Sequence, residues 1–200
     1  MEPGVDAACF AQNIRLSRNS VSGPGRAYLV ASGGGPPPAT DKFTNVTIAD
    51  NEASDVFIGV MLYGSTANNF ILRNKVRNTS GLSGGLDLMC VGDCLIEGND
   101  FFGHTTTGVD GNSAIVGDLS NNVTVRFNRF GGSVGNQAAT TSGASLMLNA
   151  CNNVSVYSNL LYGARYGLWV NDNGSFSGFT ALNVSNNTIS AKERTIYLRR

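Results

Sequence analysis

Charge is scarce in this 200-residue chain and is evenly balanced, with 14 Lys and Arg against 14 Asp and Glu. The sequence therefore has no net charge to attract nucleic acid or an anionic membrane surface. No apolar run approaches the roughly 20 residues of a membrane span. The first residues, Met1-Glu2-Pro3-Gly4, have neither the basic start nor the apolar core of a signal peptide. We expect no nucleic-acid partner, no membrane span and no signal peptide in this chain.

Metal ligands are equally few. The chain has 1 His and 4 Cys. Cys90 and Cys94 have no second pair of ligands beside them, so the spacing predicts no metal site, and no cofactor is evident. Cys94 occupies an inward position of the repeat described below, and Cys90 lies two residues after the inward Leu88. Two buried free thiols fit this spacing, and so does a disulfide between them.

Helical periodicity is also absent, and 25 Gly and 23 Asn, counted over the sequence, are too many for long helices. The chain has instead an asparagine that recurs in one local frame. Its positions are Asn19, Asn51, Asn74, Asn99, Asn128, Asn159 and Asn187. Successive positions are 32, 23, 25, 29, 31 and 28 residues apart. One small structural unit is therefore repeated along the chain.

Each recurring asparagine follows two apolar residues and precedes a third, with few exceptions. Around Asn128, for example, Val123 and Val125 lie five and three positions before it and Phe130 lies two positions after it. Alternation of period two predicts strands with one buried face on either side of a two-residue bend. We expect the recurring asparagine to supply the left-handed conformation that such a bend needs.

A further apolar pair follows each asparagine at a variable distance, in most cases directly after Gly or Ser. The pairs are Ala27/Leu29, Val60/Leu62, Leu86/Leu88, Ala114/Val116, Leu146/Leu148, Leu168/Val170 and Ile196/Leu198. Each unit thus contains three short strands, and its length varies mainly before the third, as is usual in solenoids. Since stacked strands lie about 4.8 Å apart, we expect a rod of roughly 30 to 35 Å.

The asparagine ladder and the recurring Asn-Val-Ser/Thr-Val-x-x-Asn-x-apolar segments resemble the right-handed parallel β-helix of the pectin-lyase-like superfamily. The resemblance covers roughly residues 13–200 and predicts an all-β solenoid of about seven coils, each of three short strands. It predicts a single domain, 1–200, with an irregular lead-in at 1–12. Residues 32–42, which are rich in Gly and Pro, are expected to form a loop on the first coil.

Proteins of this fold include polysaccharide lyases, hydrolases, phage tailspikes and adhesins. The resemblance therefore implies a polysaccharide partner and an extracellular or virion-associated setting, with Ca²⁺ as a cofactor by analogy alone. The polygalacturonase-like branch carries Asn-Thr-Asp, Asp-Asp, Gly-His-Gly and Arg-Ile-Lys motifs, and none of them occurs here. Gly103-His104-Thr105 matches only part of one, so no catalytic residue is carried across.

The resemblance places active sites on the outer face of one sheet, which directs attention to the outward positions of the third strands. These positions are mostly aromatic, aliphatic or thioether side chains, and only Asp87 and Arg199 are charged. We expect this apolar stripe to pack under a loop or a partner chain, or to stack sugars. The predicted substrate-binding residues are Tyr28, Tyr63, Asp87, Trp169, Asn171 and Tyr197.

Two pairs of residues are candidate catalytic groups. Asp118 and Asp172 align two coils apart, about 9.6 Å between backbones, near the upper end for an inverting carboxylate pair. The alternative is that both cap turns. His104 and Asp110 share a loop and could form an acid–base pair, the alternative being a solvated surface histidine.

The sequence leaves different classes of function open. One is recognition or processing of a polysaccharide, as a lyase or hydrolase if the chain is an enzyme. Another is a non-catalytic structural or adhesive module that packs on a partner through the apolar stripe, and a third is an inactive scaffold. Because no capping helix is visible at either end and an open solenoid end exposes strand edges, we also expect a longer parent protein, or ends covered by a neighbouring chain or a second copy.

Overall fold

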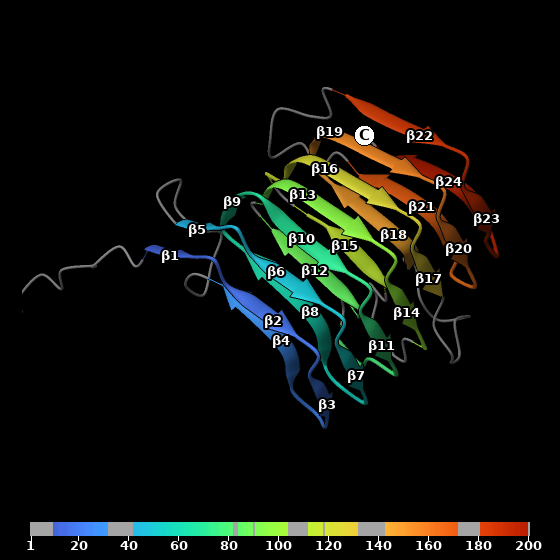
Figure 1. The fold of residues 1–200 in the computed structure, drawn as a ribbon. Helices are drawn as coiled ribbons and strands as arrows, with labels where there is room; N and C mark the ends of the chain where they lie inside the picture. The colour runs from blue at the N-terminus through green and yellow to red at the C-terminus, as the bar shows by residue number, and fades with distance from the viewer. Residues whose placement is uncertain are drawn as a thin grey trace, which may run out of the picture.

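The chain folds as a solenoid of parallel β-strands (Figure 1). The structure, a computed structural model, describes residues 10–31, 42–81, 84–89, 91–103, 112–117, 119–131, 143–171 and 181–199. In these ranges all regular structure is β-strand. None of the described segments forms a helix of the length and apolarity that crossing a membrane requires. The predicted all-β parallel solenoid is confirmed.

Three seven-stranded parallel sheets, named here after their first strands, run along the solenoid. The β2 sheet contains β2 (Arg15–Ser17), β6 (Thr47–Ala49), β10 (Asn69–Leu72), β13 (Gly92–Glu97), β16 (Asn121–Arg126), β19 (Asn152–Tyr157) and β22 (Leu182–Ser185). The β3 sheet contains β3 (Ser20–Ser22), β7 (Glu52–Ser54), β11 (Lys75–Arg77), β14 (Asp100–Phe102), β17 (Arg129–Gly131), β20 (Leu160–Tyr162) and β23 (Thr188–Ser190). The β4 sheet contains β4 (Arg26–Ala31), β8 (Ile58–Tyr63), β12 (Leu86–Met89), β15 (Ala114–Val116), β18 (Ala144–Asn149), β21 (Tyr166–Asn171) and β24 (Arg194–Arg199).

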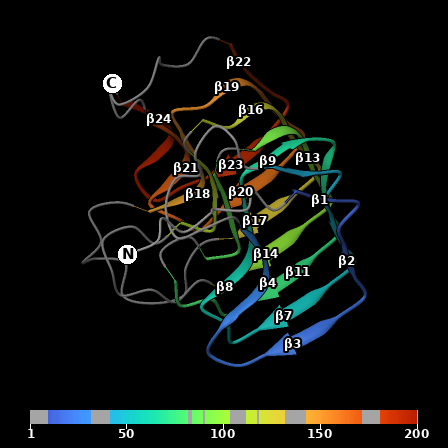
Figure 2. The ribbon, with the colours of Figure 1, turned by 90° about the vertical axis from the view of Figure 1, so that its left-hand side faces the viewer.

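A fourth, smaller sheet lies near the N-terminal end of the solenoid (Figure 2). It consists of β1 (Phe10–Gln12), β5 (Lys42–Thr44) and β9 (Ser65–Ala67). β1 falls within the expected irregular lead-in, and β5 begins at the last residue of the expected Gly/Pro-rich loop. Both segments are therefore more ordered at these positions than the sequence indicated, because each pairs in parallel with a neighbouring strand.

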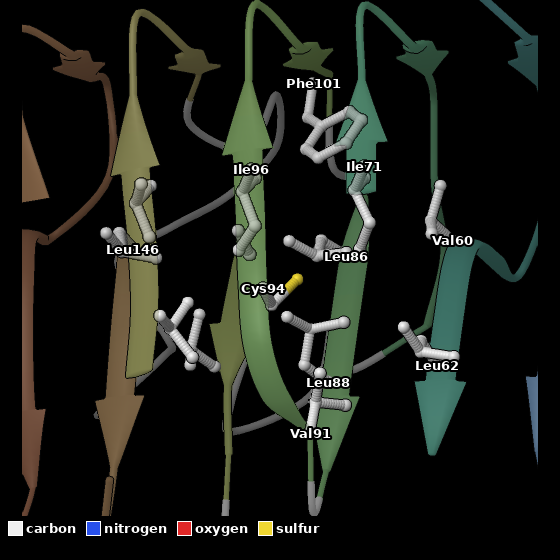
Figure 3. Close-up of a cluster of buried hydrophobic side chains, with 14 of the residues drawn as sticks. Val60, Leu62, Ile71, Leu86, Leu88, Val91, Cys94, Ile96, Phe101 and Leu146 are labelled. Carbon is white, nitrogen blue, oxygen red and sulfur yellow. The ribbon is translucent and has the colours of Figure 1, made fainter. Parts of the chain in front are cut away.

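The core fills the interior of the solenoid, where side chains from the three long sheets meet (Figure 3). The inward pairs Val60/Leu62 and Leu86/Leu88 of the β4 sheet pack there with residues of the β2 sheet such as Ile71. All five of these residues are fully buried. The predicted inward pairs are confirmed for six strands of the β4 sheet by their strand register.

The first strand of the β4 sheet is the exception. β4 pairs with β8 so that Tyr28 lies opposite Val60 and Val30 opposite Leu62, whereas Leu29 lies opposite the outward Met61. The inward pair is therefore Tyr28/Val30, and the predicted pair Ala27/Leu29 is wrong by one residue. Since a one-residue slip exchanges the two faces of a strand, this moves Tyr28 from the predicted outer stripe into the core.

Gly, Ser or Ala precedes six of the seven inward pairs, and this regularity was the signal for the correct register. A Cβ atom on Gly59 would lie 2.5 Å from Cγ1 of Val76, and one on Gly85 would lie 2.6 Å from Cβ of Phe101. The β3 and β4 sheets approach so closely at this corner that larger residues would clash. Ala27 occupies the same place in β4, which leaves Tyr28 and Val30 as the inward pair.

The recurring asparagines form a hydrogen-bonded ladder at the bend between the β2 and β3 sheets. Asn99 shows the pattern: its backbone N–H and its Nδ2 both donate to Oδ1 of Asn128, at 2.9 Å each. Its Nδ2 also donates to the Ile71 carbonyl at 2.8 Å, and its Oδ1 accepts from the backbone N–H and Nδ2 of Asn74 at 2.9 and 3.0 Å. Buried amide groups are thus satisfied by neighbouring coils, as burial requires.

We predicted that the ladder asparagine itself adopts the left-handed conformation of this bend. That prediction is wrong, because the residue before the asparagine adopts it instead. Those residues have φ between 52° and 66° and are Arg18, Asp50, Arg73, Gly98, Phe127, Ser158 and Asn186. The bend accepts many side chains there because they point outward, although each non-glycine residue adopts this conformation at an energetic cost. Asparagine recurs one position later because its amide bonds to both neighbouring coils.

Cys94 lies at the inward position of β13, as predicted, in register with Asn69 and Val123 of the adjacent strands. It is a buried free thiol, and burial raises its pKa to about 12. Cys90 lies outside the described residues. Because the thiolate is the reactive form, Cys94 is a packing residue of the core.

Replacing Asn99 by alanine should lower the free energy of unfolding by about 3 kcal/mol or more. The substitution removes the four hydrogen bonds of the Asn99 amide, worth about 1 kcal/mol each, and leaves the buried Asn74 N–H without an acceptor. Asn19→Ala is the matched control, because Asn19 is exposed at the N-terminal end of the ladder and should cost much less. Urea denaturation of both variants measures the difference, and equal losses would contradict the ladder's role.

Ser158→Gly should stabilise the protein by up to about 1 kcal/mol, because glycine adopts the left-handed conformation (φ 56°) without strain. Ser155→Gly makes the same chemical change inside β19 and should destabilise by about 0.5 to 1 kcal/mol. Thermal unfolding of the two variants tests the assignment of the bend. A loss of stability in Ser158→Gly as large as that in Ser155→Gly would refute it.

Candidate functional site

The outer face of the β4 sheet carries the predicted stripe in continuous strand register. We call its central line the outer row. The outer row consists of Leu29, Met61, Asp87, Ile115, Met147, Trp169 and Tyr197. Tyr28 is not part of it, because its ring is buried and its hydroxyl donates to the carbonyls of Asn19 and Glu52 at 2.9 and 2.7 Å. Tyr28 therefore has a structural role at the end of the core.

Asp87 and Tyr63, both predicted as substrate-binding residues, lie together on the outer face. The Tyr63 hydroxyl donates to Oδ2 of Asp87 at 2.7 Å, and Asp87 is only 8% exposed. Burial, reinforced by the negative charge of Asp87, raises the pKa of Tyr63 well above its usual value. Tyr63 thus stays protonated, and Asp87 is occupied by its hydrogen bond from Tyr63. The pair therefore stabilises the outer face of the β4 sheet.

The C-terminal end of the outer row is an aromatic cluster. The ring centroids of Tyr166 and Tyr197 lie 4.7 Å apart, and those of Tyr166 and Trp169 lie 5.7 Å apart. Trp169 is only 5% exposed, so its ring offers no free face for a sugar in this structure. Beside the cluster, Nδ2 of Asn171 donates to Oδ1 of Asn149 at 2.7 Å. The predicted residues Trp169, Asn171 and Tyr197 are thus adjacent, and Tyr197 and Asn171 are partly exposed.

The candidate catalytic residues Asp118, Asp172, His104 and Asp110 lie outside the described residues, and their proposed pairings stay predictions. Within the described ranges, Asp87 is the only carboxylate on the outer face of the β4 sheet. The described side chains also contain no group of three or more His, Cys, Asp and Glu arranged to hold a metal ion. The described part of this face therefore offers neither a second carboxylate for hydrolysis nor a Ca²⁺ cage.

A hollow lies elsewhere, at the corner between the β2 and β3 sheets, and the sequence analysis missed it. Its volume is about 460 Å³. Its lining comes from the same turn in three successive coils and consists of Phe127, Asn128, Arg129, Ser158, Asn159, Leu160, Asn186 and Thr188. Phe127 is 57% exposed at its rim. The ladder asparagines form the floor, so the hollow rests on the most constrained part of the fold.

Aromatic side chains on the β3 sheet pack around Arg129, which lines the hollow. On the β3 sheet, the rings of Phe102 and Tyr162 stack with centroids 6.1 Å apart. The Arg129 guanidinium lies 5.9 and 5.5 Å from these two ring centroids, and its Nε donates to the Tyr162 hydroxyl at 3.0 Å. That hydrogen bond raises the pKa of Arg129. Asp100, on β14, accepts a hydrogen bond from Arg77 at 2.7 Å.

A second set of the same residue types lies across the bend, on the β2 sheet. Arg126 donates from Nε to Glu97 at 2.6 Å and from Nη1 to the Tyr157 hydroxyl at 3.0 Å. The rings of Phe127 and Tyr157 meet edge to face at 6.2 Å. We call the two sets together the aromatic–arginine face. It consists of Glu97, Asp100, Phe102, Arg126, Phe127, Arg129, Tyr157 and Tyr162.

The sequence does carry a signal for this face. The first two strands of most coils have Ser, Thr or Asn at many outward positions, whereas these middle coils have aromatic residues and arginine. The analogy with known active sites restricted the prediction to the third strands. Reading the outward positions of all three sheets in register would have shown the concentration.

Comparison with known proteins assigns no family to the chain. No protein-family model matches the chain, and no curated protein matches it. Among solved structures, it is similar to the Streptococcus pneumoniae surface protein and adhesin PfbA, with 17% sequence identity and a TM-score of 0.45. The match covers 80% of this chain and 50% of that chain, so this chain spans about half of that protein's length.

Gly131→Ala should open the ring stack with little loss of stability. Gly131 lies between Phe102 and Tyr162, and a Cβ atom there would come 2.6 Å from Phe102 Cδ2 and from the Tyr162 hydroxyl. The rings lie on the surface and can move apart, so we expect a cost near the lower end of the roughly 1 to 3 kcal/mol seen for overpacking. Ring-current shifts in the NMR spectrum report the separation. Gly25→Ala, which meets open space, is the control; unchanged Tyr162 resonances in Gly131→Ala would contradict the packing.

Proposed function

We propose that this chain is a polysaccharide-recognising module in which a right-handed β-helix of seven coils presents the aromatic–arginine face to a glycan. Right-handed connections are the rule for parallel strands, and the three seven-stranded sheets supply one strand each to every coil. The observation that carries the proposal is the concentration of rings and guanidinium groups, all at least partly exposed, beside a hollow of about 460 Å³.

The chemistry of this face suits a sugar chain. Exposed aromatic rings present an apolar surface on which the C–H face of a sugar packs, while tyrosine hydroxyls remain available as polar groups. Arg126 and Arg129 donate hydrogen bonds, and Ser158, Thr188 and Asn186 both donate and accept. Aromatic residues and arginine also dominate binding energy at interfaces. The face therefore combines apolar contact with the polar groups that fix orientation.

Recognition is favoured over cleavage on this face. Hydrolysis of a glycosidic bond uses two carboxyl groups with different protonation states on either side of the bond. Here Glu97 and Asp100 are each engaged in an ion pair with an arginine, at 2.6 and 2.7 Å, so both carboxylates are already occupied by neighbouring cations. Processing of a polysaccharide therefore rests on the predicted residues Asp118, Asp172, His104 and Asp110, and a Ca²⁺ cofactor on analogy alone.

Packing of the outer row on a partner chain is the second candidate function. Leu29 is 47% exposed at one end of the row, and Met61, Ile115 and Met147 are partly exposed along it. A line of aliphatic and thioether side chains of this kind is typical of a protein contact. The module would then be adhesive or structural, with its contact surface on the β4 sheet.

Binding to an array of neutral and acidic polysaccharides, followed by titration of the best ligand, tests the proposal. Phe127→Ala and Tyr162→Ala should each weaken binding about tenfold or more, as expected for aromatic residues central to an interface. Both side chains are on the surface, so the fold should be retained. Arg73→Ala is the control, because Arg73 occupies the same bend two coils away and is bonded to Asp50.

The outcomes separate the candidate functions. Binding that survives both aromatic substitutions but is lost in Met147→Ala would move the site to the outer row. Absence of binding to any polysaccharide would contradict recognition altogether. If the bound polysaccharide is cleaved, Asp118→Asn and Asp172→Asn should abolish turnover. Unchanged turnover in these variants would exclude Asp118 and Asp172 as the catalytic carboxylates.

A further inference from the structure

Arg129 is the one charged side chain among the described residues that line the hollow at the bend between the β2 and β3 sheets. The side chain is 51% exposed. Its nearest carboxylate oxygen in the described chain, Oδ1 of Asp100, lies 3.7 Å from its Nε, which is too far for a hydrogen bond. The hollow therefore has a positive charge on its wall and no negative charge beside it.

The two carboxylates of the aromatic–arginine face are paired with other arginines. Arg126 contacts Glu97 at 2.6 Å, and Arg77 contacts Asp100 at 2.7 Å. The guanidinium of Arg126 is fully engaged, because Nε and Nη2 face Glu97 and Nη1 donates to a tyrosine hydroxyl at 3.0 Å. Arg129 is therefore the cation of this face that has no carboxylate of its own.

Neighbouring rings hold the Arg129 guanidinium in one orientation. Its Nε donates to the Tyr162 hydroxyl at 3.0 Å, and its plane lies 5.9 and 5.5 Å from the ring centroids of Phe102 and Tyr162. No described residue accepts a hydrogen bond from Nη1 or Nη2. The planar fork of an arginine matches an oxyanion with two parallel hydrogen bonds, and a group that is already oriented loses less entropy on binding.

The other polar groups of the hollow are neutral. Ser158, Asn186 and Thr188 line it from the next two coils, and their side chains form no hydrogen bonds with described residues. Their hydroxyl and amide groups can donate to an oxyanion or to sugar hydroxyls. The amides of Asn128 and Asn159 in the floor are committed to the ladder. Arg129 is thus the group that distinguishes a charged ligand from a neutral one.

We propose that the polysaccharide bound at this hollow is acidic, and that a carboxylate, sulfate or phosphate on one of its sugars pairs with Nη1 and Nη2 of Arg129. This inference rests on the proposed recognition function and names the class of polysaccharide. The sugar ring beside the oxyanion would pack on Phe127, which is 57% exposed. A neutral chain would gain only neutral hydrogen bonds, which are about half as strong as charged ones.

Charge distinguishes this ligand from a single-stranded nucleic acid, which also combines oxyanions with groups that stack on rings and arginine. Sites for single strands have a positively charged groove that follows many phosphates. Here Glu97 and Asp100 offset the charges of Arg126 and Arg77. One cation without a carboxylate of its own suits one acidic substituent, so the face favours an acidic polysaccharide.

Titration of acidic polysaccharides and their neutral counterparts tests the proposal. The array includes dextran with carboxymethyl-dextran and dextran sulfate, and mannan with phosphomannan. Carboxyl reduction, desulfation or phosphatase treatment supplies the neutral form of any other acidic polysaccharide that binds, and the treatment that weakens binding identifies the oxyanion. We expect the best ligand to be acidic, its neutral form to bind about tenfold more weakly or worse, and salt to weaken the acidic form alone.

Arg129→Gln should remove this preference for the acidic form, and Arg129→Lys, which keeps the charge without the fork, should retain part of it. Arg73→Gln is the control, because it removes a positive charge from the same bend two coils away and should leave the preference unchanged. Circular dichroism confirms that each variant is folded.

The outcomes separate this inference from the function on which it rests. A neutral best ligand, or an Arg129→Gln variant that keeps the full preference for the acidic form, overturns the inference and leaves polysaccharide recognition in place. Tighter binding of oligothymidylate than of every polysaccharide identifies a nucleic-acid site and overturns it as well. Absence of binding to any polysaccharide contradicts the recognition function, and the inference fails with it.

Discussion

The structure depends on one repeated interaction, the hydrogen bonding of a buried asparagine to the coils on both sides of it. Each ladder amide satisfies its own polar groups, a strand carbonyl of the preceding coil and the backbone N–H of a neighbouring asparagine. Buried polar groups without partners are costly, so each coil constrains the position of the next. The ladder therefore sets both the register of the sheets and the place of the bend between the β2 and β3 sheets.

This constraint leaves the outward positions free to vary, and the differences between coils lie there. The bend accepts arginine, aspartate, phenylalanine or serine just before the ladder asparagine, because those side chains point to solvent. In the middle coils this freedom yields Phe127 and Arg129 above a floor of Asn128 and Asn159. A rigid floor with variable side chains above it is the usual basis of a binding surface on a repeat protein. The proposed recognition face is thus a consequence of how the coils are held.

Much of the fold was predictable from the sequence, because period-two alternation and the spacing of Asn19 to Asn187 report directly on strands and bends. Two details were not. Tyr28 was placed on the wrong face because an aromatic residue fits either side of a strand. The recurring small residue before the inward pairs carries the register, but its meaning follows from the close approach of the β3 and β4 sheets at Gly59. The left-handed residue was misassigned because asparagine suits a bend in two ways: it tolerates positive φ, and its amide both donates and accepts hydrogen bonds. The sequence does not distinguish between these two uses.

The candidate site was less predictable for a physical reason. Sites such as the aromatic–arginine face bring together residues from different coils, and their significance appears only when coils are in register. Phe102 and Tyr162 are two coils apart, and they meet because Gly131 between them has no side chain. Neither ring nor glycine is informative alone. Analogy with active sites of similar folds directed attention to the outer row, where Asp87 is held by Tyr63 and Trp169 is buried.

Native-state hydrogen exchange of the ladder amides tests most directly whether the asparagine ladder holds the coils together. The backbone N–H groups of Asn74, Asn99 and Asn128 donate to buried Oδ1 atoms, so they should exchange only through global unfolding. The N–H of Asn187, which has no such acceptor among the described residues, should exchange far faster. Exchange of the three central amides at a rate like that of Asn187 would contradict the account.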